Sequence, residues 1–196
     1  MAQYYLFFKP YQVLSQFSPE GDKKTLAHFF TQLPKDIYPV GRLDYDSEGL
    51  LLLTNDKALT HQLLEPRFAH QRTYYVQVEG AITHDAIQQL MKGVTISING
   101  VQHLTKKCIA KKLSVPQLPD RNPPIRYRKE IPTSWISLTL TEGKNRQVRR
   151  MTAAVGFPTL RLVRAAIGKV TIEGMMPGDI MEMDASVKAQ LMARQS

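Results

Sequence analysis

The sequence predicts an α+β protein built on a long mixed sheet with helices on its flanks. Short apolar or alternating segments typical of strands are interleaved with segments that carry apolar residues at helical spacing. The chain has neither a glycine-rich phosphate-binding loop nor a regular strand–helix–strand repeat, and both are expected of a doubly wound parallel sheet. Its 196 residues, 43% of them hydrophobic, are enough to bury a substantial core.

The first third of the chain is expected to contain three strands and two helices. The aromatic segment 4–8 predicts a strand, because it is rich in β-forming residues and is followed by Lys-Pro. Apolar residues at helical spacing predict a helix over 25–33, which the next proline ends. A short strand at 38–40 leads into a charged loop, and the leucine run 50–53 predicts a buried strand. Polar residues suited to an N-cap then introduce a helix over 56–64.

The rest of the chain continues the same alternation of strands and helices. Five prolines in the segment 114–133 predict irregular structure there, because proline cannot donate a backbone hydrogen bond. Glycine at the end of the helix near residue 91 is a suitable C-terminal cap. The expected strands are 72–79, 94–97, 107–112, 135–141 and 159–168, and the expected helices are 83–91 and 145–155.

Positive charge is concentrated in one part of the sequence, although the formal net charge of the whole chain is +9. The segment 105–170 holds fifteen Lys or Arg and three Asp or Glu, whereas the remainder holds eleven and fourteen. Such a block predicts binding to a polyanion, because each neutralised phosphate also releases condensed counterions. No apolar run is long enough for a membrane span, and no secretory signal is recognisable. We therefore expect a cytoplasmic protein that binds nucleic acid and no membrane.

The most informative motif is the acidic loop 41–49, Gly-Arg-Leu-Asp-Tyr-Asp-Ser-Glu-Gly. Asp44, Asp46 and Glu48 crowd into five positions of a basic protein, directly before the leucine run. A loop joined to a buried strand can hold a carboxylate in place for catalysis, although solvated turn residues have the same pattern. A calcium loop is excluded, because Asn55 stands where a bidentate glutamate is needed and four leucines would face water.

This loop resembles the signature of the pseudouridine synthases that act on ribosomal RNA. The segments 72–76, 142–151 and 162–168 resemble the family's Arg-x-Tyr strand, its basic helix start and its closing strand. Residues 4–16 and 121–126 resemble the bacterial branch that modifies large-subunit RNA. The resemblance implies a mixed, largely antiparallel sheet in two lobes, flanked by helices and divided by a central catalytic cleft. It also implies that residues 1–196 form a single catalytic domain without an N-terminal RNA-binding module.

The resemblance implies roles for five residues in converting uridine to its C-glycoside isomer. Asp44 would be the catalytic carboxylate, either attacking C1′ as a nucleophile or removing the C2′ proton. Arg149 would keep that carboxylate ionised. Tyr74 would stack on a uridine taken out of the RNA helix, and the adjacent tyrosine is expected in the core. Arg42 would fill the space that the flipped base leaves, and Val148 would line the uracil pocket.

The basic residues around the second motif are candidates for binding RNA. Cations in the first turns of the helix 145–155 are opposed by the helix dipole, so we expect external anions to compensate them. Neither chemical route needs a cofactor or a metal, and none is expected. The expected partner is large-subunit ribosomal RNA or an assembling ribosomal particle, bound by a monomer. The predicted RNA-binding residues are Lys144, Arg146 and Arg150, together with Arg126 and Arg128 of the proline-rich segment.

Two other functions are compatible with parts of this pattern. A non-catalytic RNA-binding protein of ribosome assembly would share the basic surface but would not need Asp44. A metal-dependent hydrolase could use the acidic loop, and a chelator would abolish its activity. The isomerase is favoured over both, because Asp44, Tyr74 and Arg149 occur in matching motifs in the order of the family.

Overall fold

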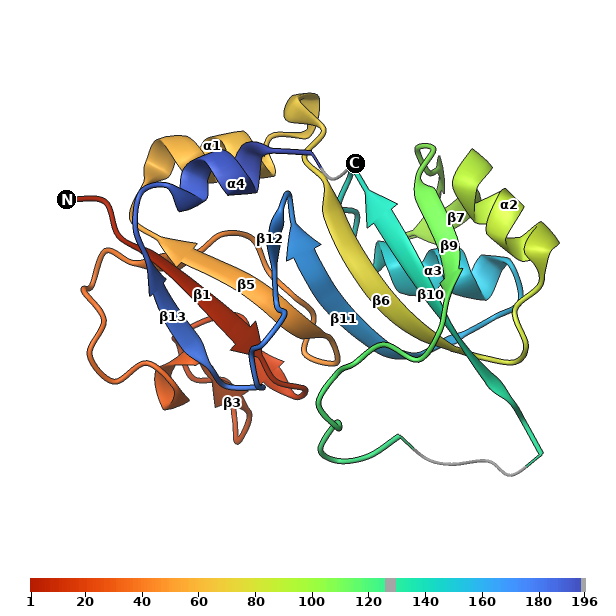
Figure 1. The fold of residues 1–196 in the computed structure, drawn as a ribbon, viewed down its shortest axis with the longest axis horizontal. Helices are drawn as coiled ribbons and strands as arrows, with labels where there is room; N and C mark the ends of the chain where they lie inside the picture. Colours follow the sequence, from red (N-terminus) through yellow and green to blue (C-terminus); the bar gives the residue numbers. More distant parts are fainter. Residues whose placement is uncertain (126–129, 195–196) are drawn as a thin grey trace. The chain divides into compact units, whose positions relative to one another are not determined.

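The computed structural model describes residues 1–125 and 130–194 (Figure 1). The chain forms two compact units: unit 1 comprises residues 1–70 and 163–196, and unit 2 comprises residues 71–162. Each unit combines β-sheet with helices, so the predicted α+β class is confirmed. The segment 126–129, which includes Arg126 and Arg128, lies outside the described residues.

Strand β5, Glu48–Thr54, is the centre of the sheet in unit 1, and all seven of its residues are buried. Strand β1, Tyr4–Lys9, pairs antiparallel with it along nearly its whole length. Strand β4, Tyr38–Pro39, pairs with one end of β5, and the other end pairs in parallel with strand β11, Thr159–Ile167. Strand β13, Ile180–Met183, covers the outer edge of β1. The leucine run forms this strand because it is apolar on both faces, as a central strand requires.

Two helices lie beside each other in unit 1, as Figure 1 shows. Helix α1, Lys57–Leu64, begins at the N-cap Asp56, whose carboxylate accepts a 3.0 Å hydrogen bond from the Leu59 amide. Helix α4, Val187–Met192, contributes Lys188, which lies 2.9 Å from the same carboxylate. The predicted helix start after residue 55 is therefore confirmed. The smaller elements of unit 1 are β2 (Val13–Leu14), β3 (Lys24–Thr25), β12 (Val170–Thr171), and the 3-10 turns Leu26–His28 and Pro66–Phe68.

The helix predicted over 25–33 is wrong, because only a 3-10 turn over Leu26–His28 forms there. The apolar residues of this segment pack onto the sheet instead. The ring of Phe7 on β1 lies 5.2 Å from that of Phe29 and 5.1 Å from that of Phe30. The helical spacing of apolar residues thus reflects contacts with a strand rather than one face of a helix.

Unit 2 contains an antiparallel sheet in the order β6, β10, β9 and a separate two-stranded hairpin. Its core is formed by alternate residues of β6 and β10 together with one face of each helix, including Val76, Leu138, Leu90 and Met151. Strand β6 has the predicted bounds. The elements are β6 (Arg72–Glu79), α2 (His84–Lys92), β7 (Thr95–Ile98), β8 (Val101–Leu104), β9 (Ile109–Leu113), β10 (Thr133–Leu140) and α3 (Gln147–Ala154).

Candidate functional site

The loop that carries Asp44 is held by the buried side chain of Ser15. The Ser15 hydroxyl accepts a 3.0 Å hydrogen bond from the Leu43 amide and donates a 2.9 Å hydrogen bond to the Leu43 carbonyl. The Ser47 amide donates to the Asp44 carbonyl at 3.0 Å and closes a turn. Asp44 is half-buried between these two fixed points. Its carboxylate is therefore presented by backbone that is constrained on both sides.

Gly49 ends the loop at a position where no side chain fits. Its φ is +109°, a conformation that favours glycine. In the parallel pair of β5 with β11, Gly49 lies opposite Arg164, and an added Cβ would meet the Arg164 backbone. The second glycine of the motif thus allows the loop to join the central strand where another strand comes close.

A buried lysine, which was not among the predicted site residues, lies next to the acidic loop. Lys9 is 0% exposed, and its ammonium donates to the carbonyls of Pro10 at 2.9 Å and Val13 at 2.7 Å. Burial lowers the pKa of Lys9 to about 7, and the nearby carboxylates, of which Glu48 has the largest effect, partly oppose this shift. Glu48 is itself only 2% exposed. The position of Lys9 directly after an apolar strand segment was the feature of the sequence that could have indicated its burial.

Glu48 and Asp46 are thus part of the electrostatic surroundings of Lys9, and Asp44 contributes a smaller effect of the same sign. The buried guanidinium of Arg164 acts on Lys9 in the opposite direction, and its Nε donates to the Leu50 carbonyl at 2.7 Å. Ser47, Glu48 and Gly49 of the acidic loop are buried, whereas Asp44 and Asp46 are half-buried. Buried Lys9, Glu48 and Arg164 form a cluster of mixed charge at the end of β5.

Tyr74 and Val148 both contribute to the hydrophobic core of unit 2. Val148 is 4% exposed, and Tyr74 is half-buried and packs against the cluster that contains Val148. Alternation along β6 places Tyr74 on the face that also carries Val76 and Val78. Tyr75 was expected to be buried in the core, but it is half-buried. Tyr74 is thus partly accessible beside an apolar cluster.

The start of α3 differs from the prediction. Arg146 is the N-cap, with a φ of +50°, and the helix begins at Gln147, so Lys144 and Arg146 precede it rather than lie in its first turn. The Gln147 side chain accepts a 2.9 Å hydrogen bond from the Lys144 amide and donates a 2.7 Å hydrogen bond to Glu142. Buried Glu142 therefore lies at this helix start, in addition to the anions that were expected there, Asp44 and the RNA phosphates.

The remaining candidates differ in how firmly they are held. Arg149 is half-buried within the first turn of α3, and Lys144 and Arg146 are exposed. The guanidinium of Arg150 donates to the carbonyl of Ser97 on β7 and to the Asn145 side chain. Arg42 is exposed in unit 1, and its guanidinium lies 3.4 Å from the Gln16 side-chain oxygen. Arg150 is thus partly committed to contacts within unit 2.

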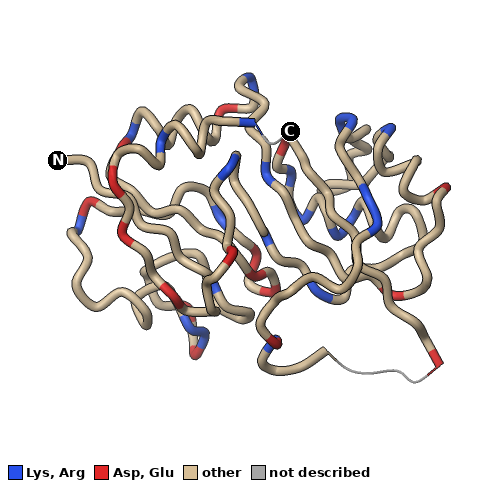
Figure 2. The backbone as a smooth tube through the Cα atoms, in the orientation of Figure 1, with Lys and Arg blue, Asp and Glu red and all other residues tan. Residues whose placement is uncertain are grey.

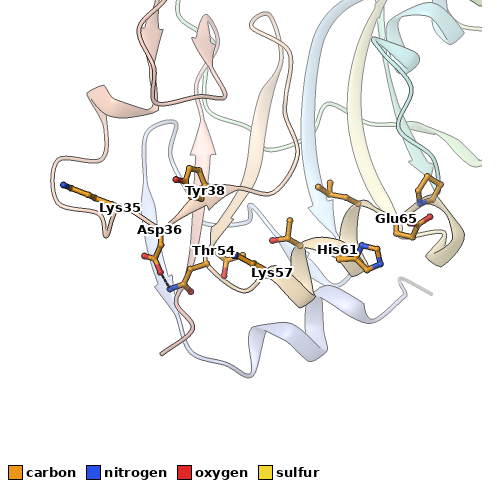
Figure 3. Close-up of a pocket in the computed structure, with 11 residues that line it drawn as sticks. Lys35, Asp36, Tyr38, Thr54, Lys57, His61 and Glu65 are labelled. Carbon is orange, nitrogen blue, oxygen red and sulfur yellow. Dashed lines mark hydrogen bonds between the residues drawn. The ribbon is translucent and has the colours of Figure 1, made fainter.

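A groove of about 820 Å³ lies at the other end of β5 from the acidic loop (Figure 3). Tyr38 and Thr54 line it from the strands, and Lys57 and His61 line it from α1. Lysines and carboxylates are equally represented in its lining, and none of the predicted site residues takes part. The groove is therefore separate from the candidate active site.

Charge is divided between the two units (Figure 2). Unit 2 contains fifteen Lys or Arg and five Asp or Glu, whereas unit 1 contains eleven and twelve. The basic block in the sequence thus corresponds almost entirely to one folded unit. Attraction of a polyanion is expected to act mainly on unit 2.

The described residues contain neither a membrane-spanning helix nor a cluster of metal ligands. Among residues 1–125 and 130–194, no helix is long and apolar enough to cross a membrane. The same residues contain no group of three or more His, Cys, Asp or Glu side chains arranged to hold a metal ion.

Comparison with known proteins connects these residues to one family. The family model for RNA pseudouridylate synthase matches residues 3–154. Ribosomal large subunit pseudouridine synthase E of Xanthomonas axonopodis pv. citri (strain 306) is 51% identical over 174 residues, which cover 88% of this chain and 89% of the relative. The Vibrio vulnificus (strain CMCP6) protein of the same name is 47% identical over 178 residues, covering 91% and 74%.

A solved structure agrees with these sequence matches. A crystal structure of a pseudouridylate synthase superposes with a TM-score of 0.78 at 26% identity, covering 97% of this chain and 74% of that one. The predicted fold is thus confirmed as that of this family, and the non-catalytic alternative is not supported. The chain belongs to the RNA pseudouridylate synthase family, whose members are isomerases that modify RNA.

Proposed function

We propose that this protein converts one uridine of large-subunit ribosomal RNA into pseudouridine, with Asp44 as the catalytic carboxylate. The observation that carries the proposal is the fixed position of Asp44 in the family's motif. Ser15 and the turn at Ser47 hold the backbone on both sides of it. The names of the relatives from Xanthomonas and Vibrio favour large-subunit RNA as the substrate.

The reaction breaks the bond between C1′ and N1 of uridine and forms a bond between C1′ and C5. Uracil must turn between these steps, C5 loses its proton, and N1 gains one, so atoms balance without another reactant. Asp44 can attack C1′ and be displaced by C5, or it can remove the C2′ proton and return it after the base has turned. Both routes need an ionised carboxylate in a fixed place.

The other candidates are proposed to support Asp44 and the flipped base. Arg149 favours the ionised form of the carboxylate through its positive charge. Tyr74 offers an aromatic face to the uracil, a type of contact that contributes about 1–3 kcal/mol per base. Val148 supplies the apolar wall behind it, and Arg42 occupies the place from which the base has left.

Contact with the RNA backbone is proposed for the basic residues of unit 2. Exposed Lys144 and Arg146 are well placed for phosphates, because they precede α3 on an ordered loop. Arg150 contributes through its remaining donors, and Arg126 and Arg128 are proposed to select the RNA site. We further propose that the protein acts as a monomer in the cytoplasm, which light scattering and cell fractionation test.

The decisive experiment maps pseudouridine on a large-subunit ribosomal RNA transcript after incubation with the purified protein and a chelator. Wild-type protein is expected to form pseudouridine at one position. Asp44→Asn is expected to form none, with a loss of at least about 10⁴-fold in rate, because it removes the group that forms or breaks bonds. RNA affinity is expected to change little.

Asp46→Asn is the matched control, because Asp46 is a half-buried carboxylate of the same loop. It is expected to retain most of the activity. Modification that survives Asp44→Asn would assign catalysis to another group, and activity that the chelator abolishes would favour a metal-dependent enzyme. Absence of modification by the wild-type protein would overturn the proposed substrate.

A further inference from the structure

Four exposed lysines lie within seven residues of unit 2, before and on β9. They are Lys106, Lys107, Lys111 and Lys112. The sequence has no acidic residue between Asp85 and Asp120, so no carboxylate of this segment neutralises them. Within the described parts of the chain, the ion pairs found involve none of these four ammonium groups. The segment therefore presents concentrated positive charge to solvent.

The backbone on either side of Lys106 and Lys107 is fixed to the body of unit 2. Buried Thr105 donates its amide to the Val94 carbonyl at 3.0 Å, and its hydroxyl accepts from the Val94 amide at 2.9 Å. On the other side, the amide and the thiol of Cys108 donate to carbonyls near the end of α2, each at 3.1 Å. The two lysines are thus displayed on a short segment held at both ends.

Buried Glu142 connects this segment to the basic residues that precede α3. One of its oxygens accepts hydrogen bonds from the Lys106 amide at 2.8 Å and from the Gln147 side chain at 2.7 Å. Gln147 in turn accepts a hydrogen bond from the Lys144 amide at 2.9 Å. The Lys106 backbone is therefore bonded directly to the Glu142 carboxylate, and the Lys144 backbone is connected to the same carboxylate through the Gln147 side chain.

Strand β9 extends the positive charge along the edge of the sheet. It pairs only with β10 among the described strands, with Lys111 opposite Ser137 and Lys112 opposite Ile136. Adjacent residues of a strand point to opposite faces, so lysine lies on both faces of this edge. Lysines at a strand edge also prevent aggregation between edges, and that explanation does not involve RNA.

We propose that these four lysines form a second phosphate-binding surface for the substrate RNA, continuous with Lys144 and Arg146. The proposal rests on the proposed function, in which RNA is the substrate. Lysine is a flexible point charge that neutralises phosphates without reading sequence, so this surface would hold the RNA near the site while other residues choose the uridine.

Charge-reversing substitutions distinguish a role of these lysines in RNA binding from a role in preventing aggregation at the β9 edge. The variants Lys106→Glu/Lys107→Glu and Lys111→Glu/Lys112→Glu keep a charged, aggregation-resistant surface but repel phosphate. Binding of each to a large-subunit ribosomal RNA transcript is measured over a series of salt concentrations. We expect affinity to fall about tenfold or more, and the plot of log affinity against log salt to become shallower by about 1–2. The rate at saturating RNA is expected to stay within about twofold, because the uridine still reaches the same catalytic residues.

The matched control is Lys35→Glu/Lys169→Glu, which changes two exposed lysines of unit 1 and shifts net charge equally. It is expected to weaken binding less than about threefold, because unit 1 has little net charge. Equal losses in control and test variants would overturn the proposal in favour of a net-charge effect. Unchanged RNA affinity in the test variants would overturn the proposal and leave prevention of aggregation at the β9 edge as the role of these lysines. The measurement of RNA affinity does not require catalysis. Failure of the proposed catalytic function would therefore appear separately, as wild-type protein that binds the RNA but forms no pseudouridine.

Discussion

At the scale of single residues, Lys9 combines a long charged side chain with no exposed surface. A buried lysine is tolerated when its ammonium is hydrogen-bonded and lies near opposite charge. Two backbone carbonyls accept from Lys9, and the carboxylates of the acidic loop favour its charged form. Lys9 is therefore bonded to the backbone that follows the first strand and interacts electrostatically with the loop that carries Asp44.

The burial of Lys9 predicts a pH dependence of stability. Its pKa falls from 10.5 to about 7 on folding, so the unfolded chain binds more protons between these values and stability rises with pH. Lys9→Met is expected to lack this rise, which amounts to at most about 1.4 kcal/mol per pH unit. Urea unfolding of both proteins from pH 6.5 to 9.5 measures it.

Exposed Lys169 of unit 1 supplies the control for that experiment. Lys169→Met is expected to follow the wild-type dependence on pH. If the unfolding free energies of Lys9→Met and wild type ran parallel over this range, Lys9 would not be the group that is shifted by burial.

At the scale of elements, the carboxylate of Asp56 joins three parts of unit 1. It caps α1 through the Leu59 amide, accepts from the Tyr4 hydroxyl at 2.9 Å, and pairs with Lys188 of α4. These contacts explain why two helices far apart in the sequence lie side by side (Figure 1). The first of them is local, whereas the other two depend on the folded unit.

Asp56→Ala is expected to lower the free energy of unfolding by about 1–2 kcal/mol at pH 7, because it removes the N-cap of α1. Asp56→Asn keeps a capping oxygen and is expected to lose less. The backbone hydrogen bond from Leu59 is the main cause that lowers the pKa of Asp56 to about 2. The stabilisation by the ionised Asp56 carboxylate is therefore complete above pH 3.8 and is lost as the pH falls through about 2. Chemical unfolding at pH 7 and at pH 3 measures this, and Asp56→Ala is expected to lower the free energy of unfolding less at pH 3 than at pH 7.

At the scale of the whole molecule, charge and candidate chemistry are divided between the units. Asp44 belongs to the nearly neutral unit 1, and the basic residues belong to unit 2. The proposed mechanism uses residues of both units. The pairing of Asp44 with Arg149 remains a prediction that rests on that relation.

A double-mutant cycle tests this pairing through unfolding free energies. If the two charges meet, the effects of Asp44→Asn and Arg149→Met will fail to add by about 0.5–3 kcal/mol, because the second substitution removes an interaction that is already lost. The cycle of Asp46→Asn with Arg149→Met is the control and is expected to be additive. Equal coupling in both cycles would mean that the interaction is not specific to Asp44.

Features that depend on neighbouring residues or on strong periodicity could be predicted from the sequence alone. Alternation fixed the bounds of β6, and the polar residues before α1 indicated its start. The acidic loop and the basic motifs were sufficient to indicate the family. The segment 25–33 was predicted incorrectly, because the spacing of its apolar residues is satisfied by rings on β1 rather than by a helix.

The contacts that support the functional motifs, by contrast, depend on the folded structure. Ser15 holds a backbone segment 28 residues away, and Glu142 joins Lys106 to the start of α3. Nothing in local spacing reveals these hydrogen bonds, because their partners become neighbours only after the sheets have formed. The same reason applies to Lys9, whose burial and lowered pKa arise from strands and carboxylates brought around it by folding.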